Sequence, residues 1–334
     1  MTIRFALLGA GRIGKVHAKA ITSNSAARLV AVADAMEAAA KAIAEQYRCE
    51  VRSIDAIAAA RDIDAVVICT PTDTHADLIE QFSKAGKAIF CEKPIDLSVK
   101  RVKDCLKVVA TNKTTLMVGF NRRFDPHFMA VRAAIDAGEI GEVEMVTIVS
   151  RDPGAPPIEY VKRSGGIFRD MTIHDFDMAR FLLGEDIETV SAQASVLVDK
   201  AIGEAGDYDS VSVMLSTASG KHATISNSRR ATYGYDQRIE VHGSVGSVAA
   251  ENQRAVSIEV ANARGYTRPP LYDFFMTRYT QAYANEIATF IDAIGGKAKA
   301  SPSGEDGLIA LALADAAVKS VKEGRAVKVS EVLG

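Results

Sequence analysis

The chain has 334 residues, of which 48% are hydrophobic, so two domains with separate cores are the ordinary expectation. Its 40 basic and 42 acidic residues nearly balance, and it has no dense run of Lys or Arg, so a nucleic-acid partner is not expected. The apolar runs are far shorter than the roughly 18 residues of a membrane helix, and the N-terminus lacks a secretory signal's layout, so we expect a cytoplasmic protein without membrane association.

Short apolar runs alternate with Ala-rich segments of helical periodicity over the first part of the chain. The candidate strands are "IRFALLG", "LVAVAD", "AVVICT", "AIFCE" and "TLMVGF". Alternating strands and helices predict a parallel sheet with helices on both faces, and near-continuous apolar strands agree because such strands are buried on both sides. We therefore predict an α/β fold class with a doubly wound parallel sheet over residues 1–121.

The first predicted strand runs into "GAGRIG", in which the glycines have the spacing G-x-G-x-x-G. In this pattern the glycines permit a tight turn, close approach of the backbone to a pyrophosphate, and close packing of the helix on the strand. A glycine turn without a ligand is the alternative, but the preceding strand and the following helix both fit a Rossmann domain. We predict a dinucleotide site at Gly9, Ala10, Gly11, Arg12, Ile13 and Gly14.

Asp34 ends the second predicted strand, twenty residues beyond Gly14. An acid at this place accepts hydrogen bonds from the adenosine ribose hydroxyls and repels a 2′-phosphate. No Arg follows closely that would hold such a phosphate. The sequence therefore predicts NAD rather than NADP as the cofactor.

Two later strands end in "CTPTDTH" and "CEKP", and ligands of a doubly wound sheet bind beyond the carboxyl ends of its strands. We expect Thr70 and Pro71 to line the nicotinamide ribose, and His75 to cap the next helix or to approach the cofactor. Lys93 is expected to present its ammonium near the reacting carbon, although a solvated surface lysine is the ordinary alternative.

The remaining chain, residues 122–334, has a different pattern. Polar and apolar residues alternate in "DSVSVMLS", "HATISNS" and "QRIEVHG", at 209–216, 222–228 and 237–243, which predicts an antiparallel sheet with one covered face. Helical stretches are expected around 276–294 and 305–322. The segment "RDPGAPP" at 151–157 is typical of a loop and is a candidate wall or lid of a site.

The segment "FRDMTIHDFD" places Asp170 and His174 four residues apart, which brings them to one face of a helix. A carboxylate that orients an imidazole is a recurring arrangement for proton transfer. Acids are also favoured near any helix start by the helix dipole, so these residues alone leave both interpretations open.

Taken together, these segments resemble the glucose-fructose oxidoreductase and inositol dehydrogenase (Gfo/Idh/MocA) family of sugar and polyol dehydrogenases. The resemblance covers essentially the whole chain and rests on "GAGRIG", "CTPTDTH", "CEKP", "GFNRRFDP", "GGIFRDMTIHDFDMARFLLG", "IEVHGSVG" and "GEDGLIALALADAAVKS". Within the family, "RRATYGYDQRIEVHG" at 229–243 is most similar to the inositol 2-dehydrogenases.

The resemblance implies a second, α+β domain over residues 122–334 with a large, mostly antiparallel sheet, and commonly a homotetramer assembled through sheet faces. It implies NAD-dependent oxidation of a cyclic polyol, with myo-inositol converted to 2-keto-myo-inositol (scyllo-inosose). Catalytic roles pass to Lys93, Asp170 and His174, and Glu92 and Lys93 are expected to contact the cofactor. The implied substrate contacts are Lys93, Arg123, Asp152, Asp170, His174, Asp177, Tyr233 and Tyr235.

The expected chemistry is removal of a hydroxyl proton by a neutral His174 while hydride leaves the same carbon. Asp170 would orient the ring and stabilise the imidazolium, and Lys93 would stabilise negative charge on the oxygen. No metal is required by this scheme. Two alternatives remain: an aldose 1-dehydrogenase that converts glucose or xylose to a lactone, and a dinucleotide-binding regulator without turnover, which should have lost one of these residues.

Overall fold

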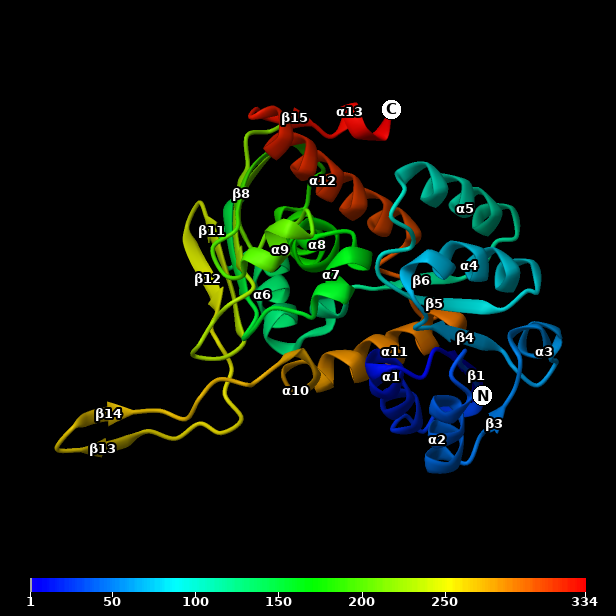
Figure 1. Ribbon diagram of the computed structural model, residues 1–334. Helices are drawn as coiled ribbons and strands as arrows, with labels where there is room; N and C mark the ends of the chain where they lie inside the picture. The colour runs from blue at the N-terminus through cyan, green and yellow to red at the C-terminus, as the bar shows by residue number, and fades with distance from the viewer. Residues whose placement is uncertain (1) are drawn as a thin grey trace. The chain divides into compact units, whose positions relative to one another are not determined.

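The computed structural model describes residues 2–334, and the chain forms two compact units (Figure 1). The first unit comprises the chain up to Asp125 together with Gln281–Leu311, and the second comprises Pro126–Thr280 and Ala312–Gly334. Residues 281–311 thus belong to the first unit, although they lie far along the chain from its other residues. The functional division at residues 121 and 122 stays a prediction.

The first unit is built on a six-stranded parallel sheet with the strand order β3-β2-β1-β4-β5-β6. Its strands are β1 (Ile3–Leu8), β2 (Ala27–Ala33), β3 (Glu50–Val51), β4 (Ala65–Ile68), β5 (Ala88–Glu92) and β6 (Leu116–Gly119). The order reverses between β1 and β4, and this switch point is where doubly wound sheets bind their ligands. The predicted parallel sheet and α/β class are confirmed.

Helices cover both faces of this sheet, with α1 and α2 on one side and α4 and α5 on the other (Figure 1). The helices of the unit are α1 (Arg12–Thr22), α2 (Glu37–Tyr47), α3 (Ile54–Ala59), α4 (His75–Lys84), α5 (Val99–Thr111), most of α11 (Thr280–Ile294) and the first part of α12 (Gly304–Glu323). Phe290 of α11 packs its ring 6.1 Å from Phe5 of β1 and 5.8 Å from Phe90 of β5. These contacts make α11 part of the core of the first unit.

The second unit is built on a seven-stranded sheet with the order β12-β11-β7-β10-β9-β8-β15. Its strands are β7 (Val143–Arg151), β8 (Ile187–Ser195), β9 (Ser210–Thr217), β10 (His222–Ser228), β11 (Asp236–Gly243), β12 (Gly246–Ala250) and β15 (Val327–Lys328). Only the β7–β10 pair is parallel. Buried and exposed residues alternate along β9 and β11, so the predicted antiparallel sheet with one covered face is confirmed.

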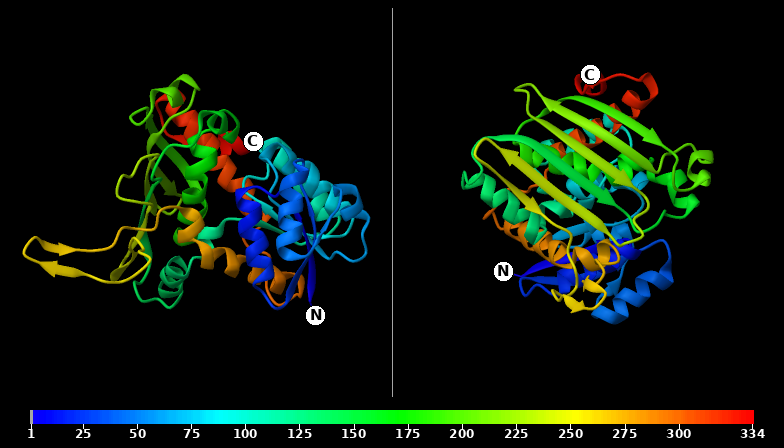
Figure 2. Two further views of the ribbon diagram at one scale, coloured as in Figure 1. Left: turned by 60° about the horizontal axis from the view of Figure 1, so that its bottom comes forward. Right: turned by 90° about the vertical axis from the view of Figure 1, so that its left-hand side faces the viewer.

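One face of this sheet is covered by helices, and the other is open in the second view of Figure 2. The unit contains α6 (Pro126–Asp136), α7 (Ile158–Ser164), α8 (Ile173–Leu183), α9 (Lys200–Glu204), α10 (Phe275–Arg278), α13 (Ser330–Leu333) and the later part of α12 (Gly304–Glu323). Helix α8 packs on β7 and β10, and α6 packs on β12. The hairpin of β13 (Val260–Asn262) and β14 (Gly265–Thr267) projects away from the sheet (Figures 1 and 2).

Across residues 2–334, no helix is both long enough and apolar enough to cross a membrane.

Candidate active site

The turn after β1 contains three glycines with different surroundings. Gly9 has a left-handed φ of +96°, and a Cβ there would lie 2.5 Å from the carbonyl oxygen of Cys69. A Cβ at Gly14 would lie 2.0 Å from the carbonyl oxygen of Gly9, so α1 rests directly on the turn. A Cβ at Gly11 would meet nothing within 4 Å. Gly11 precedes α1 and no side chain caps this helix, so the turn fits a dinucleotide pyrophosphate at the helix N-terminus.

Asp34 follows β2, and its carboxylate lies against the glycine turn. Its Oδ2 accepts a hydrogen bond from the N–H of Ala10 at 2.5 Å, and its Oδ1 accepts one from the N–H of Met36 at 2.7 Å. The two bonds fix the carboxylate beside the turn, where the fingerprint places the adenosine ribose. Arg12 and Ile13, which the sequence also predicts to bind the cofactor, form the start of α1.

The segments after β4 and β5 are joined by His75, which begins α4 and is 2% exposed. Its Nε2 lies 2.8 Å from the carbonyl oxygen of Thr70, and its Nδ1 lies 2.8 Å from the carbonyl oxygen of Pro94. The Thr70 hydroxyl also lies 2.6 Å from that of Thr74, next to the exposed Pro71. His75 therefore fixes two predicted cofactor-binding segments to each other, and its direct contact with the cofactor stays a prediction.

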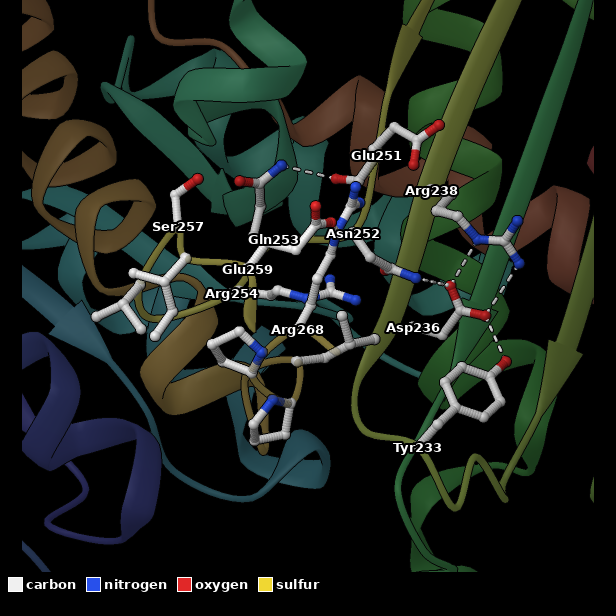
Figure 3. Close-up of a pocket in the computed structure, with 15 residues that line it drawn as sticks. Tyr233, Asp236, Arg238, Glu251, Asn252, Gln253, Arg254, Ser257, Glu259 and Arg268 are labelled. Carbon is white, nitrogen blue, oxygen red and sulfur yellow. Dashed lines mark hydrogen bonds and ion pairs between the residues drawn. The ribbon is translucent and has the colours of Figure 1, made fainter. Parts of the chain in front are cut away.

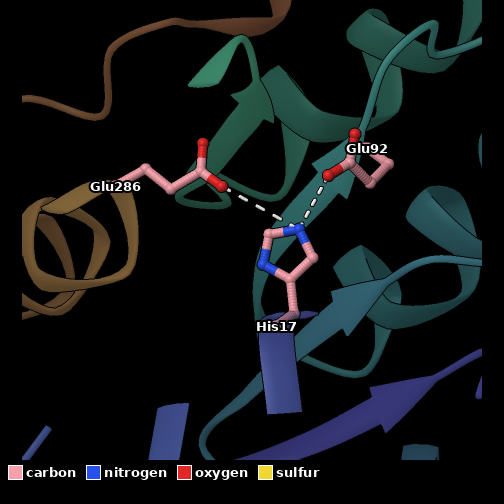
Figure 4. Close-up of side chains that lie close together, drawn as sticks. All are labelled: His17, Glu92 and Glu286. Carbon is pink, nitrogen blue, oxygen red and sulfur yellow. Dashed lines mark hydrogen bonds and ion pairs between the residues drawn. The ribbon is translucent and has the colours of Figure 1, made fainter. Parts of the chain in front are cut away.

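Lys93 is half-buried and directly follows Glu92, the last residue of β5. The carboxylate of Glu92 contacts the buried imidazole of His17 on α1, with Nε2 and Oε1 2.7 Å apart. Glu286 of α11 completes a buried group around the same imidazole (Figure 4). No local sequence pattern indicates this group, because its members come from distant segments of the chain.

Arg123, predicted to contact substrate, lies in a short 3-10 helix, Asn121–Phe124, of the first unit. Its Nη2 lies 3.1 Å from Oδ1 of Asp306, and the Arg123 side chain is only 8% exposed. Burial acts to raise the pKa of Asp306, but Arg123 and hydrogen bonds from Ser303 hold this pKa below its usual value. Arg123 thus has a structural partner within its own unit, and its substrate contact stays a prediction.

Asp170 belongs to the second unit and lies in a π-helical turn, Phe168–Thr172, that leads into α8. Its Oδ1 accepts a hydrogen bond from the hydroxyl of Tyr160 at 2.7 Å, and its Oδ2 accepts one from Nη2 of Arg229 at 3.3 Å. The Arg229 side chain is 2% exposed and also lies 3.9 Å from Oδ2 of Asp207. Tyr160 and Arg229 were not among the residues predicted from the sequence. The π-helical turn, a feature that occurs frequently at functional sites, becomes visible only in the structure.

His174 is the second residue of α8 and is half-buried. The next residue, Asp175, is fully buried and accepts hydrogen bonds from the Ser150 hydroxyl at 2.6 Å and the Asn227 amide at 2.8 Å. These bonds fix the start of α8 on β7 and β10, so at least one acid of the segment has a structural role. The predicted pairing of Asp170 with His174 stays a prediction.

The other predicted substrate residues of the second unit are spread over several of its elements. Asp152 follows β7, and its N–H donates to the carbonyl oxygen of Ser228 at 2.9 Å. Asp177 is 3% exposed on α8. Tyr235 is also buried, with its ring edge-on to Phe274 at 5.8 Å. Their contacts with substrate stay predictions.

Tyr233 lies at a polar cavity of about 1020 Å³ in the second unit (Figure 3). Its hydroxyl accepts a hydrogen bond from Arg151 at 3.0 Å and donates one to Oδ2 of Asp236 at 2.6 Å. Burial acts to raise the pKa of Asp236, but hydrogen bonds from Arg238, Tyr233 and Asn252 hold this pKa below its usual value. The cavity is lined by neither Asp170 nor His174, so this polar network is separate from the π-helical turn.

Two stretches of the chain match protein families. Residues 3–120 match the oxidoreductase family with an NAD-binding Rossmann fold, and residues 128–249 match the GFO/IDH/MocA C-terminal domain. The chain belongs to the Gfo/Idh/MocA family. The predicted resemblance and the NAD cofactor are confirmed, and the chain is an NAD-dependent oxidoreductase.

Several Gfo/Idh/MocA relatives match over nearly their full length. An inositol 2-dehydrogenase from Rhizobium meliloti (strain 1021) is 76% identical over 330 residues, which are 99% of this chain and 100% of that protein. The structure of a myo-inositol dehydrogenase from Corynebacterium glutamicum ATCC 13032 is 44% identical with a TM-score of 0.95, covering 98% and 99% of the two chains. A scyllo-inositol dehydrogenase from Lactobacillus casei with bound NAD(H) and scyllo-inositol is 30% identical with a TM-score of 0.92, covering 99% and 100%.

Proposed function

We propose that this chain oxidises myo-inositol to 2-keto-myo-inositol, with NAD as the hydride acceptor, in cytoplasmic polyol catabolism. The observation that carries the proposal is the 76% identity, over 99% of the chain, to a protein named inositol 2-dehydrogenase. The presence of Lys93, Asp170 and His174 adds support, because together they provide an acid–base group and a cation for a reacting alcohol.

In the proposed reaction, His174 accepts the proton of the substrate hydroxyl through its neutral imidazole. Asp170 orients that imidazole and stabilises the imidazolium that forms. Tyr160 and Arg229 restrict the carboxylate of Asp170 through their hydrogen bonds, so they are positioning residues. Lys93 stabilises the negative charge that develops on the oxygen as its proton leaves.

The first unit holds the cofactor in this proposal. The glycine turn and the uncapped start of α1 receive the pyrophosphate, and Asp34 accepts hydrogen bonds from the adenosine ribose. NAD supplies the carbon that accepts hydride when it is bound. His75 keeps the segments of Thr70 and Pro94 together, which limits movement of the loops around the nicotinamide end.

The test is to incubate the purified protein with NAD and a panel of inositol isomers, glucose and xylose, while following the absorbance of reduced nicotinamide. Oxidation of myo-inositol to a ketone is the expected result, and Lys93→Met should abolish most of it. Lys100→Met is a matched control, because Lys100 is exposed on α5 and pairs with Asp104. A lactone from an aldose, with inert myo-inositol, would favour the aldose dehydrogenase. Binding of NADH without any turnover would favour the regulator.

We further propose that four copies of the chain assemble into a homotetramer through the open face of the seven-stranded sheet. Met145 and Met214 are 39% and 55% exposed, and both occupy outward positions of this sheet, on β7 and β9. Thr147 and Thr224 lie beside them in the strand register. Exposed apolar side chains on an uncovered sheet face support contact with a second copy. Light scattering after gel filtration should give the tetramer mass, and Met214→Lys should lower it.

A further inference from the structure

The first unit contains a buried group of one imidazole and two carboxylates, none of which has a catalytic role in the proposed reaction (Figure 4). His17 comes from α1, Glu92 from the end of β5, and Glu286 from α11. The side chains of His17 and Glu286 are completely buried, and that of Glu92 is 12% exposed. From Nε2 of His17 the distances are 2.7 Å to Oε1 of Glu92 and 3.9 Å to Oε1 of Glu286.

The carboxyl group of Glu286 has no hydrogen-bond partner among residues 2–334 at either oxygen, although it points toward His17. Burial raises its pKa well above the usual range of glutamic acid, and the nearby Glu92 carboxylate raises it further. An ionised carboxylate that is buried and unpaired costs far more than a neutral one. Its burial without a hydrogen-bond partner therefore favours the neutral acid more than in an ordinary glutamic acid, and Glu92 is the carboxylate that hydrogen-bonds to His17.

A bound metal ion is the competing explanation, because the three potential ligand atoms lie within 4.8 Å of one another. Zinc with bonds of about 2.0–2.2 Å holds neighbouring ligand atoms roughly 3.3 Å apart. The 2.7 Å separation of the His17 and Glu92 atoms is instead that of a charge-assisted hydrogen bond. The geometry favours a proton between the two side chains over a metal ion.

The contact with His17 restrains the residue that directly precedes Lys93. On its other side, the Glu92 carboxylate packs against β6, where a Cβ at Gly119 would lie 3.1 Å from it. The His17 ring is itself held by two aromatic rings, Phe90 at 5.1 Å and Tyr283 at 5.6 Å. The end of β5 is thus fixed by helix α1, which directly follows the glycine turn.

We propose that His17 and Glu92 are positioning residues for Lys93, because their hydrogen bond fixes the end of β5 directly before Lys93. This inference rests on the proposed role of Lys93 in the oxidation. In the group, Nε2–H of His17 donates to Glu92, which fixes the end of β5 and sets the start of the Lys93 segment. A small displacement of Lys93 would be enough to slow the reaction, because catalysis depends on its position to a fraction of an ångström.

The test compares His17→Leu, His17→Gln and Glu286→Gln with the wild-type enzyme, using kcat, KM and the dissociation constant of NADH. His17→Leu removes the donor and should lower kcat by about 10- to 100-fold, while NADH affinity stays within about threefold. His17→Gln retains an N–H donor of similar reach and should recover most of the lost kcat. Glu286→Gln imitates the protonated acid and should remain within about twofold of wild type.

Thermal unfolding checks that each variant is folded, and metal analysis of the purified wild type tests the competing explanation. A normal kcat in His17→Leu would overturn the proposal, as would a defect confined to NADH affinity or a folded His17→Gln as slow as His17→Leu. A stoichiometric divalent cation that is lost in Glu286→Gln would replace it with a metal site. A wild-type enzyme that oxidises no polyol would overturn the proposed function itself, whereas the other outcomes leave that function standing.

Discussion

Gly11 and Gly14 provide a sharp test of the cofactor site, because the structure separates their roles. A Cβ at Gly14 would lie 2.0 Å from the Gly9 carbonyl oxygen, whereas ordinary contact begins at 3.4 Å. Helix α1 must therefore move by about 1.4 Å, the difference between these distances, to accommodate Gly14→Ala. Overpacking of this kind typically costs about 1–3 kcal/mol, so this variant should be less stable even without cofactor.

Gly11→Ala should behave in the opposite way. Its Cβ would meet nothing within 4 Å, and the backbone at φ −70° and ψ −165° is accessible to alanine. The free protein should keep its stability or gain about 0.4–1 kcal/mol from a less flexible unfolded chain. The methyl group would occupy the space in which the pyrophosphate approaches the turn, so NADH affinity should fall at least about tenfold, or about 1.4 kcal/mol.

Thermal unfolding without cofactor and fluorescence titration with NADH measure the two effects separately. In a large domain, each kcal/mol corresponds to about 2–4 °C in Tm, so the loss in Gly14→Ala is readily measured. Gly11→Ala should have a Tm equal to that of the wild type or slightly above it, and a smaller stabilisation by NADH. Wild-type affinity in Gly11→Ala would refute the assignment of the open space to the pyrophosphate. Wild-type stability in Gly14→Ala would refute the close contact of α1 with the turn.

Four further predictions concern specificity, proton transfer and stability. Asp34→Ala should relax the preference for NAD over NADP, measured as the ratio of kcat/KM values, and an unchanged ratio would remove Asp34 from cofactor selection. His174→Ala should lower kcat by about 10²- to 10⁴-fold with nearly intact NADH affinity. In the double variant with Asp170→Asn, kcat should fall much less than the product of the two single decreases. Effects that simply multiply would show that the two residues do not act together. Tyr160→Phe loses one hydrogen bond to Asp170 and should lower kcat by no more than about 10- to 150-fold, because a hydrogen bond to a charged group contributes about 1.5–3 kcal/mol. Burial acts to raise the pKa of Asp209, but hydrogen bonds from the N–H groups of Leu197, Asp199 and Val198 hold this pKa below its usual value. The ionised carboxylate therefore stabilises the folded state at pH values above the usual pKa of Asp. This stabilisation is lost as the pH falls through the lowered pKa. Asp209→Asn should therefore lower Tm at pH 7 but not in strong acid, and an equal deficit at both would contradict the charge effect.

The strand, glycine turn and helix of the predicted cofactor site could be predicted from sequence because their signals are local. A buried strand, a glycine turn and a helix start follow one another within β1 and α1, and Asp34 lies at the end of the next strand. The edge strand β3 was missed, because its two residues, Glu50–Val51, are too few to give a period. Topology then brings the ends of β4 and β5 beside each other, as the strand order of a doubly wound sheet requires.

The second unit shows where local patterns stop being informative. The spacing of Asp170 and His174 predicts one turn of α-helix, but the structure places Asp170 in a π-helical turn before α8. Its partner Arg229 follows β10, far along the chain, and resembles an ordinary charged residue in sequence. The same holds for Glu286, whose burial beside His17 depends on α11 joining the first unit. Partners of this kind depend on tertiary packing, which no periodicity in a single sequence encodes.

Arg229 accounts for much of the difference between the predicted and observed backbone around Asp170. Its guanidinium lies 3.3 Å from the carboxylate of Asp170 and 3.9 Å from that of Asp207, so one buried cation faces two acids. Asp207 also accepts a hydrogen bond from the N–H of Ile167 at 2.9 Å, directly before the π-helical turn. Burial raises the pKa of Asp207, and the cation opposes that increase. An unusual backbone conformation persists when several contacts hold it together. Here the same contacts also fix the carboxylate of Asp170, which we propose orients His174. The irregular turn is therefore better understood as part of the proposed catalytic arrangement than as an accident of helix initiation.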